Sequence, residues 1–359
     1  MAAIDALLVA LKERSGSDLH LAAGTPPRLR LKGNLDPIEG RGDLDDAALR
    51  TLMREIVSAE QWAEYEAGGD LDFAYGLPGV ARFRANYLVQ QNGAGAVFRI
   101  IPEQILSVEQ LGLPPAITKL ADLNKGLVLV TGPTGSGKST TLAAIVDHIN
   151  RRHCKHIVTI EDPVEFVHQN QKSVMSHREV GTHTQGFGPA LRAAIRQDAD
   201  VVLVGEMRDR ETIGLAITAA EMGMLVFGTL HTNNAAKTID RIIDSFPAKE
   251  QNQVRISLSE SLAAVVSQLL VPTADGKGRC AVHEILLRTS GLPNLIREGK
   301  IAMINSLIEG GRAMGMQSMD DTLFSLVKQG KIRGSDAYLK ATQKSRFESV
   351  GGADEQSAA

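Results

Sequence analysis

The chain has 359 residues, of which 43% are hydrophobic and 23% are charged, so at about 150 residues per domain we expect two folded domains rather than a disordered chain. The 39 basic and 42 acidic residues leave a net charge of −3, which disfavours a protein that acts mainly on nucleic acid. The two cysteines, Cys154 and Cys280, exclude a disulfide framework and a four-cysteine zinc site. These properties suit a reducing cytosol.

The amino-terminal segment has the apolar spacing of a surface helix with one buried face, at Ile4, Leu7, Leu8 and Leu11. An acidic residue, Asp5, stands where a secretory signal peptide would carry positive charge. The longest charge-free stretches of the chain are too short to cross a bilayer as helices. We therefore expect no direct membrane insertion.

The first part of the chain has the pattern of a small mixed domain. Residues 18–32 alternate between apolar and polar side chains, which predicts strands. Helical spacing follows over residues 49–56, after an acidic stretch that favours a helix amino terminus. From residue 70 to residue 101 the strand pattern returns, interrupted by glycine-containing breaks. Strands and helices in separate runs predict an α+β domain over residues 1–101.

A segment rich in proline and glycine, residues 102–115, is predicted to be a linker and a hinge. Beyond it, short apolar strands alternate with helices. The predicted strands cover residues 126–131, 156–160, 200–204 and 224–228. Apolar runs without alternation are typical of strands buried on both faces, so residues 116–345 are predicted to form an α/β domain with a mostly parallel sheet and carboxyl-terminal helices. Residues 346–359 are expected to form a disordered tail.

Directly after the first of these strands, the sequence GPTGSGKS fits the phosphate-binding pattern G-x-x-x-x-G-K-[ST], and a helix pattern follows it. Glycines let the backbone N–H groups of such a loop point at a phosphate, and the new helix adds the positive end of its dipole. Lys138 is expected to reach the β- and γ-phosphates of a nucleotide, and Ser139 to offer a hydroxyl to Mg²⁺. The predicted nucleotide-binding residues are Gly132, Pro133, Thr134, Gly135, Ser136, Gly137, Lys138, Ser139 and Thr140.

Two of the predicted strands end in carboxylates. Glu206 follows the strand that begins at Asp200, and Glu161 and Asp162 follow the strand that begins at His156. Because ligands gather at the carboxyl ends of parallel strands, each carboxylate could bind Mg²⁺ or orient an attacking water. The alternative is that these charges only mark where each strand leaves the core. Two acidic strand ends beside one phosphate loop favour the catalytic interpretation, with ATP as substrate and Mg²⁺ as cofactor.

Four segments together resemble the secretion ATPase superfamily and, within it, the retraction ATPases of type IV pili. They are the phosphate loop at 132–139, IEDPVE at 160–165, LVGEMRDRET at 203–212 and GTLHTN at 228–233. In the third segment, Gly205 and Glu206 stand where other phosphate-loop proteins carry an aspartate. The resemblance extends from Leu7 to Lys344.

The resemblance implies a PAS-like first domain, a RecA-like P-loop ATPase domain after it, and a homohexamer with ATP at the junctions between subunits. Glu161 and Glu206 would share the binding of Mg²⁺ and the activation of the attacking water. Neither carboxylate is assigned to only one of these roles.

Further residues take roles by the same resemblance. His231 would sense the γ-phosphate; the alternative is a histidine that is hydrogen-bonded for structure alone. Three arginines of the first domain, Arg82, Arg84 and Arg99, would reach the phosphates from a neighbouring domain or subunit; the alternative is that they form a solvated strand face.

The function implied by the resemblance is a Mg²⁺-dependent, ATP-hydrolysing hexameric motor that powers retraction of a type IV pilus in twitching motility. Such a motor would be cytoplasmic and peripheral at the inner membrane, held there by a pilus platform protein, with a paralogous pilus ATPase as a further partner. Residues 290–298 read SGLPNLIRE where the retraction enzymes carry AIRNLIRE. This difference leaves an alternative: an accessory or nucleotide-gated scaffold ATPase of the same machinery with little hydrolysis of its own. A nucleic-acid translocase is disfavoured because no basic stripe or row of stacking aromatics is apparent.

Overall fold

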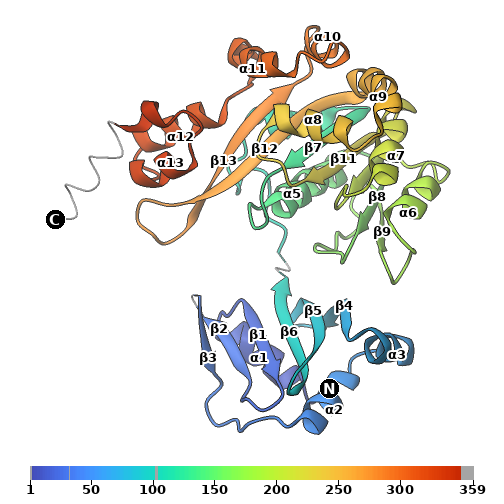
Figure 1. Ribbon diagram of the computed structural model, residues 1–359, viewed down its shortest axis with the longest axis vertical. Coiled ribbons are helices and arrows are strands. Elements are labelled where there is room, and N and C mark those ends of the chain that lie inside the picture. Colours follow the sequence, from blue (N-terminus) through green and yellow to red (C-terminus); the bar gives the residue numbers. More distant parts are fainter. Residues whose placement is uncertain (1, 32, 102–103, 349–359) are drawn as a thin grey trace. The chain divides into compact units, whose positions relative to one another are not determined.

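The structure is a computed structural model that describes residues 2–31, 33–101 and 104–348 (Figure 1). The described chain divides into two compact units. The first comprises the residues up to 104 together with 163–167, and the second comprises 105–162 together with the residues from 168 onward.

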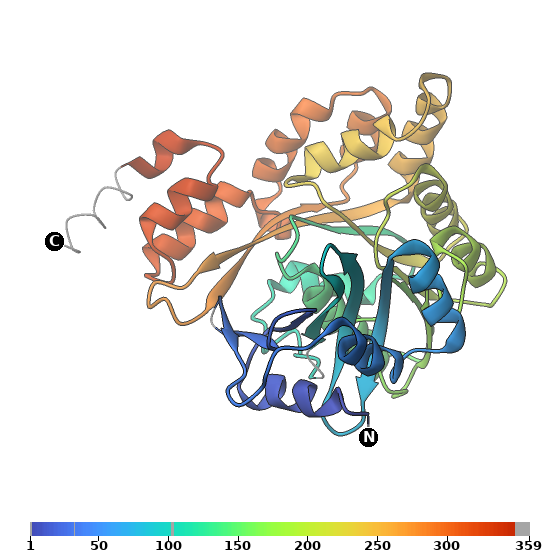
Figure 2. The ribbon, with the colours of Figure 1, turned by 60° about the horizontal axis from the view of Figure 1, so that its bottom comes forward.

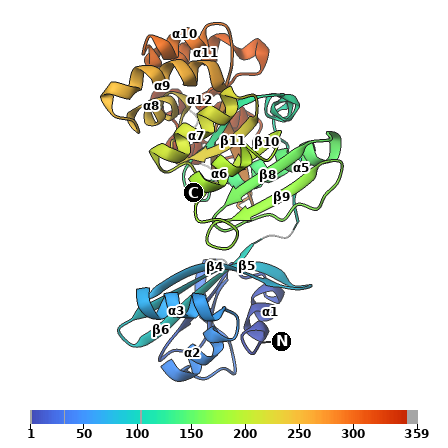
Figure 3. The ribbon, with the colours of Figure 1, turned by 90° about the vertical axis from the view of Figure 1, so that its right-hand side faces the viewer.

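Six antiparallel strands form the sheet of the first unit, in the order β3–β2–β1–β6–β5–β4. The strands are β1 (Asp18–Ala22), β2 (Arg28–Leu31), β3 (Asn34–Pro37), β4 (Asp70–Leu77), β5 (Ala81–Gln90) and β6 (Gly93–Ile101), and the helices are α1 (Asp5–Glu13), α2 (Asp46–Arg54) and α3 (Ala59–Gly68). The three helices lie on one face of this sheet (Figure 3). Their apolar side chains pack against alternate strand residues such as Phe83 and Phe98, which are fully buried. This arrangement matches the predicted α+β unit.

The helices of the first unit begin where the local sequence favours a helix start. The Asp45 side chain accepts a hydrogen bond from the N–H of Ala48 at the start of α2. α3 begins with a capping box, in which Ser58 and Gln61 each bind the other's backbone N–H. The predicted amino-terminal helix is α1, and its four apolar positions are all buried.

Seven strands form the sheet of the second unit, in the order β13–β12–β7–β11–β10–β8–β9. They are β7 (Gly126–Thr131), β8 (His156–Glu161), β9 (Val174–Glu179), β10 (Val201–Val204), β11 (Leu225–Leu230), β12 (Leu262–Pro272) and β13 (Arg279–Leu287). All neighbours are parallel except β12 and β13. The mostly parallel α/β sheet and its four predicted strands are confirmed, whereas β9, β12 and β13 were not predicted.

Helices cover both faces of this second sheet. They are α4 (Pro115–Thr118), α5 (Lys138–Arg152), α6 (Phe187–Ala194), α7 (Arg210–Glu221), α8 (Ala235–Asp244), α9 (Ala248–Ser261), α10 (Leu292–Arg297), α11 (Ile304–Gly310), α12 (Met319–Lys328) and α13 (Gly334–Lys340). Alternate residues of β7 point to opposite layers: Val128 and Val130 pack with α5, whereas Leu127 and Leu129 pack with the layer that contains α7 and α8. Double coverage explains why the central strands are apolar throughout. α12 and α13 lie beside the β13 end of the sheet (Figures 1 and 2).

Two predicted boundaries are wrong in part. The predicted linker at 102–115 is packed in part, since Val108 and Leu113 are buried in the core shared with α5, and α4 begins at Pro115. The predicted tail from residue 346 begins too early, because Phe347 is fully buried beside the Phe324 ring. In both places, proline, glycine or charged residues predict an unpacked segment, but burial of an aliphatic or aromatic side chain keeps the segment on the core. Residues 102–103 of the predicted linker and 349–359 of the predicted tail lie outside the described residues. Within the described part of the chain, none of the helices combines the length and the apolar character needed to cross a membrane.

Candidate nucleotide-binding site

The loop after β7 is shaped by three glycines with positive φ angles, Gly132 (146°), Gly135 (77°) and Gly137 (85°). Residues with side chains rarely adopt such angles. At Gly132, an added Cβ would lie only 2.2 Å from the main-chain oxygen of Gln268 in β12. Glycine is therefore required here both for the turn and for close packing against β12.

The predicted phosphate loop leads directly into α5, whose first residue is Lys138. The Lys138 Nζ donates hydrogen bonds to the carbonyl oxygens of Gly132 at 2.8 Å and Pro133 at 3.1 Å. The Ser136 hydroxyl is buried and has no hydrogen-bond partner among the described residues. Ser139 and Thr140 lie in the first turn of α5, where the free N–H groups of the helix begin. A buried, unpartnered hydroxyl, a lysine and a helix amino terminus together fit a phosphate group.

The strand ends around the loop form one continuous edge. β8, β10 and β11 run parallel with Ile160 opposite Val204 and Val204 opposite Gly228. β11 in turn pairs with β7, with Leu230 opposite the last strand residue before the loop. Glu161, Glu206 and His231 follow these paired positions, so the structure brings all three predicted strand-end residues to the edge that carries the phosphate loop.

Gly205 explains why the third segment of the resemblance reads Gly-Glu at this point. An added Cβ at Gly205 would lie 3.2 Å from the oxygen of Ile160 and 3.3 Å from the Cα of Glu161. The Gly205 N–H also donates to the Ile160 oxygen at 2.8 Å. A side chain at position 205 would therefore require the neighbouring β8 residues to shift by a few tenths of an ångström, and the carboxylate stands one residue later.

Glu206 is held by two cationic or polar neighbours. Its Oε1 lies 2.6 Å from the Nε of Arg208 and 2.9 Å from the Nε2 of His231. Burial by itself would raise the pKa of Glu206, but the hydrogen bond and charge of Arg208 and the contact with His231 outweigh it, so this pKa lies below its usual value. The carboxylate is therefore ionised at neutral pH. Arg208 was not singled out from the sequence, although it lies within the MRDRET stretch and two residues after Glu206.

Glu161 is the last residue of β8, and only 9% of it is exposed. Together with Glu206 and Ser139 it offers carboxylate and hydroxyl oxygens, the donors that Mg²⁺ prefers. Mg²⁺ is usually bound by one or two carboxylates and by substrate phosphates, so these residues fit a Mg²⁺–nucleotide complex.

The three predicted arginines lie on the first unit, on the strand face that alternates with the buried one. Arg82 and Arg84 are on β5, and Arg84 is directly opposite Arg99 of β6. The Arg99 Nε lies 2.7 Å from Asp18 Oδ1, and the Arg84 Nε lies 3.9 Å from Asp72 Oδ1. The phosphate loop belongs to the second unit.

The family model described as "Type II/IV secretion system protein" matches residues 4–330. The chain is 49% identical over 349 residues to the type IV pilus retraction ATPase PilT of Pseudomonas aeruginosa (strain PAO1), covering 96% of this chain and 99% of that relative. It is 40% identical over 335 residues to the type IV pilus ATPase PilU of the same organism, covering 93% of this chain and 87% of that relative.

Solved structures give the same result. The crystal structure of the pilus retraction motor PilT with bound ADP superposes on the chain with a TM-score of 0.89 at 42% sequence identity. The match covers 97% of this chain and 99% of that one. The family model, the full-length relatives and the superposition agree, and the chain therefore belongs to the type II/IV secretion system protein family.

Proposed function

We propose that this chain hydrolyses ATP and uses the energy to retract a type IV pilus, the motion of twitching motility. The observation that carries the proposal is the shared edge of the second sheet, which carries the phosphate loop, Glu161 and Glu206. This edge has the parts that phosphoryl transfer to water requires: a phosphate cradle, a lysine and two carboxyl side chains. The full-length similarity to a retraction ATPase supports pilus retraction as the work that this hydrolysis drives.

Binding of ATP begins at the loop. The N–H groups of the loop and of the first turn of α5 bind the phosphates, and Lys138 exchanges its two loop carbonyls for phosphate oxygens. Ser139, Glu161 and Glu206 are the residues that would hold Mg²⁺. When bound, Mg²⁺ supplies positive charge that offsets the charge of the phosphate oxygens.

The hydrolytic step rests on the two carboxylates. Glu206 stays ionised because of Arg208 and His231, so its oxygens can accept hydrogen bonds from an attacking water and fix its direction. Glu161 stands at the end of the neighbouring strand and shares this task and the binding of Mg²⁺. His231 shares a hydrogen bond with Glu206, and through that bond it would respond to the γ-phosphate.

The assembly is part of the proposal. We expect a homohexamer in which Arg82, Arg84 and Arg99 of one subunit complete the site of another, as arginine fingers do in other nucleotide hydrolases. The motor would lie in the cytoplasm, peripheral at the inner membrane, and a pilus platform protein would hold it there. A paralogous pilus ATPase is a further expected partner. No nucleic acid is expected among its ligands.

The accessory role with little hydrolysis is the less supported alternative. The chain is 49% identical to PilT and 40% identical to PilU, and both strand-end carboxylates are present.

The experiment is the Mg²⁺-dependent ATPase rate of the purified chain across a wide range of its own concentration. A specific activity that is low when dilute and rises to a plateau supports a site completed between subunits. A flat specific activity, combined with a monomer by light scattering at the lowest concentration, would contradict the shared site. Tight ATP binding without hydrolysis at any concentration would instead favour the scaffold role.

A further inference from the structure

A glutamine of β12 lies against the rear of the phosphate loop. Gln268 is only 2% exposed, in a strand whose other residues are mostly apolar. Its main-chain oxygen is the atom that would lie 2.2 Å from a Cβ at Gly132, and its side-chain Nε2 would lie 2.9 Å from a Cβ at Gly137. Gln268 thus contacts both the first and the last glycine of the loop.

The side-chain amide of Gln268 is fixed in one orientation by three hydrogen bonds. Its Nε2 donates to the carbonyl oxygen of Ser136, inside the loop, at 2.7 Å. Its Oε1 accepts from the Thr141 hydroxyl at 2.8 Å and from the His283 Nε2 at 3.1 Å. Flipping the amide would place its oxygen against the Ser136 carbonyl, which cannot donate, so the bond to Ser136 fixes the orientation.

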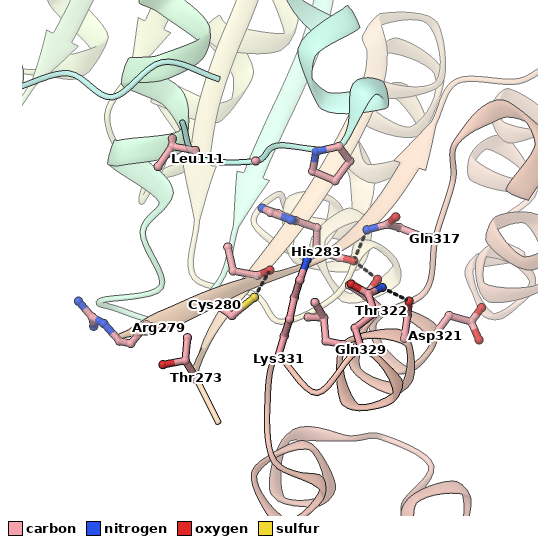
Figure 4. A pocket seen from close by; sticks show the side chains of 15 residues that line it. Leu111, Thr273, Arg279, Cys280, His283, Gln317, Asp321, Thr322, Gln329 and Lys331 are labelled. Carbon is pink, nitrogen blue, oxygen red and sulfur yellow. Dashed lines mark hydrogen bonds between the residues drawn. The ribbon is translucent and has the colours of Figure 1, made fainter. Parts of the chain in front are cut away.

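His283 provides the support behind the glutamine. It is 3% exposed, and burial lowers its pKa to about 4, so it is neutral. The Gln268 Oε1 can only accept, which assigns the proton of their shared hydrogen bond to the His283 Nε2. The His283 main-chain oxygen accepts hydrogen bonds from the Gln317 amide at 3.0 Å and the Thr322 hydroxyl at 2.8 Å (Figure 4). These bonds connect β13 to α12 beside a cavity of about 540 Å³.

We propose that Gln268 is a positioning residue that holds the phosphate loop in the shape that binds nucleotide. The inference rests on the proposed nucleotide site, because it concerns the same loop. Without the amide, the Ser136 carbonyl loses a buried partner, and the segment between Gly132 and Gly137 gains freedom that nucleotide binding must then remove. Gln268 lies behind the loop and is not itself a catalytic residue.

This role predicts a specific kinetic pattern. The loop N–H groups bind phosphate in the ground state and in the transition state alike, so a looser loop weakens both equally. The KM for ATP and the Kd for ADP should therefore rise together, while kcat changes less. A residue that only fills the core would change thermal stability without changing either binding constant.

The test compares Gln268→Met with Gln317→Met in the full-length protein. Both replacements keep the side-chain volume and remove an amide from the same hydrogen-bonded cluster, but only Gln268 touches the loop. Calorimetric titration with Mg²⁺ and ADP at a temperature well below unfolding gives the Kd of each. Loss of one buried hydrogen bond corresponds to about a tenfold rise in Kd for Gln268→Met. We expect Gln317→Met to stay within about twofold of the wild type, because the Gln317 side chain donates to the His283 main-chain oxygen and not to the loop.

Two outcomes would overturn the inference: a folded Gln268→Met variant with unchanged ADP affinity, or an equal loss of affinity in both variants. If Gln268→Met fails to fold, Thr141→Val decides instead, since it removes one of the bonds that orient the amide. We expect Thr141→Val to raise the Kd about threefold, and an unchanged Kd would refute the role. Lys138→Ala separates this inference from the site itself. If that variant binds ADP as tightly as the wild type, the proposed nucleotide site is wrong.

Discussion

The phosphate loop is bordered on two sides by polar residues of opposite character. On the strand-end side, the side chains of Glu206 and His231 are 20% and 44% exposed, and an ion pair with Arg208 and a hydrogen bond with His231 hold the carboxylate. On the β12 side, Gln268 and His283 are 2% and 3% exposed and neutral. Partly exposed charged groups can exchange their partners for a ligand, whereas a buried amide cannot give up a hydrogen bond without a large cost. We therefore expect the residues of the strand-end side, the open side, to take part in hydrolysis. We expect those of the β12 side, the buried side, to hold the phosphate loop in one shape.

The largest effect on ATP turnover is expected at Lys138, the lysine of the phosphate loop. Lys138→Ala should reduce ATP turnover by about 10³-fold or more, because no other side chain of the loop carries positive charge to the transferred phosphoryl group. Phosphate release measures the rate, and circular dichroism with thermal unfolding reports the fold. Lys172→Ala, at an exposed lysine outside the loop, is the matched control and should behave like the wild type. An unchanged rate in Lys138→Ala would remove the basis of the site.

The second largest effect on ATP turnover is expected at Glu206, on the open side. Glu206→Gln should slow turnover about 10²-fold, because the neutral amide cannot take up a proton or orient water as a carboxylate does. The affinity for ADP should change little. Glu221→Gln, at an exposed position in the last turn of α7, is the control. If Glu206→Gln instead binds ADP more weakly but turns over bound ATP at the wild-type rate, Glu206 contributes to nucleotide binding and not to hydrolysis.

The open side was accessible from the sequence because its parts are short contiguous motifs. A phosphate loop between a strand and a helix, or a carboxylate directly after an apolar strand, can be recognised within about ten residues. Parallel strands then bring such ends to one edge whatever the intervening length. Glu161 and Glu206 were found in this way, His231 came from the resemblance alone, and the two-unit architecture followed from the change in strand pattern.

The buried side could not be predicted in the same way. Gln268 is hydrogen-bonded to a residue 132 positions away, and it lies in residues 261–274, a stretch without charged side chains. β12 pairs with β7 and β13 pairs with β12, so the contact between Gln268 and the loop joins segments that lie far apart in the sequence. The boundaries of the linker and tail were wrong for the same reason, since burial of Leu113 and Phe347 depends on partners elsewhere in the chain.

Two buried histidines should make the stability of the second unit depend on pH. Burial lowers the pKa of His283 from 6.5 to about 4. Burial, and after it the charge of His177, lowers the pKa of His168 from 6.5 to about 4 as well. The unfolded chain then binds more protons than the folded chain between these values, so the second unit should lose stability as the pH falls from about 6.5 to 4. A fall of this size corresponds to roughly 3 kcal/mol per histidine.

His283→Gln tests this because a glutamine can still donate to Gln268 but does not titrate. Denaturant unfolding at pH 7 and at pH 5 should show a smaller difference for this variant than for the wild type. His183→Gln, at an exposed histidine, should keep the wild-type difference. A His283→Gln variant with the full wild-type pH dependence would mean that another group on the buried side titrates.

The smallest effect is expected at the exposed end of the Glu206 cluster. Arg208 helps to hold the pKa of Glu206 below its usual value, so Arg208→Ala should raise that pKa. If turnover needs the ionised carboxylate, the rate is lost as the pH falls through this pKa, and the acidic limb of the pH–rate profile should move to higher pH in Arg208→Ala. Near pH 8 the rate should stay close to that of the wild type, since Glu206 is ionised in both proteins.

The double variant decides whether Arg208 acts through Glu206. In Glu206→Gln the carboxylate is absent, so adding Arg208→Ala should leave the remaining pH–rate profile unchanged. A shift of similar size in both backgrounds would mean that Arg208 acts on another group of the open side. In that case the ionised state of Glu206 would have to be attributed to His231, the second partner of the same oxygen.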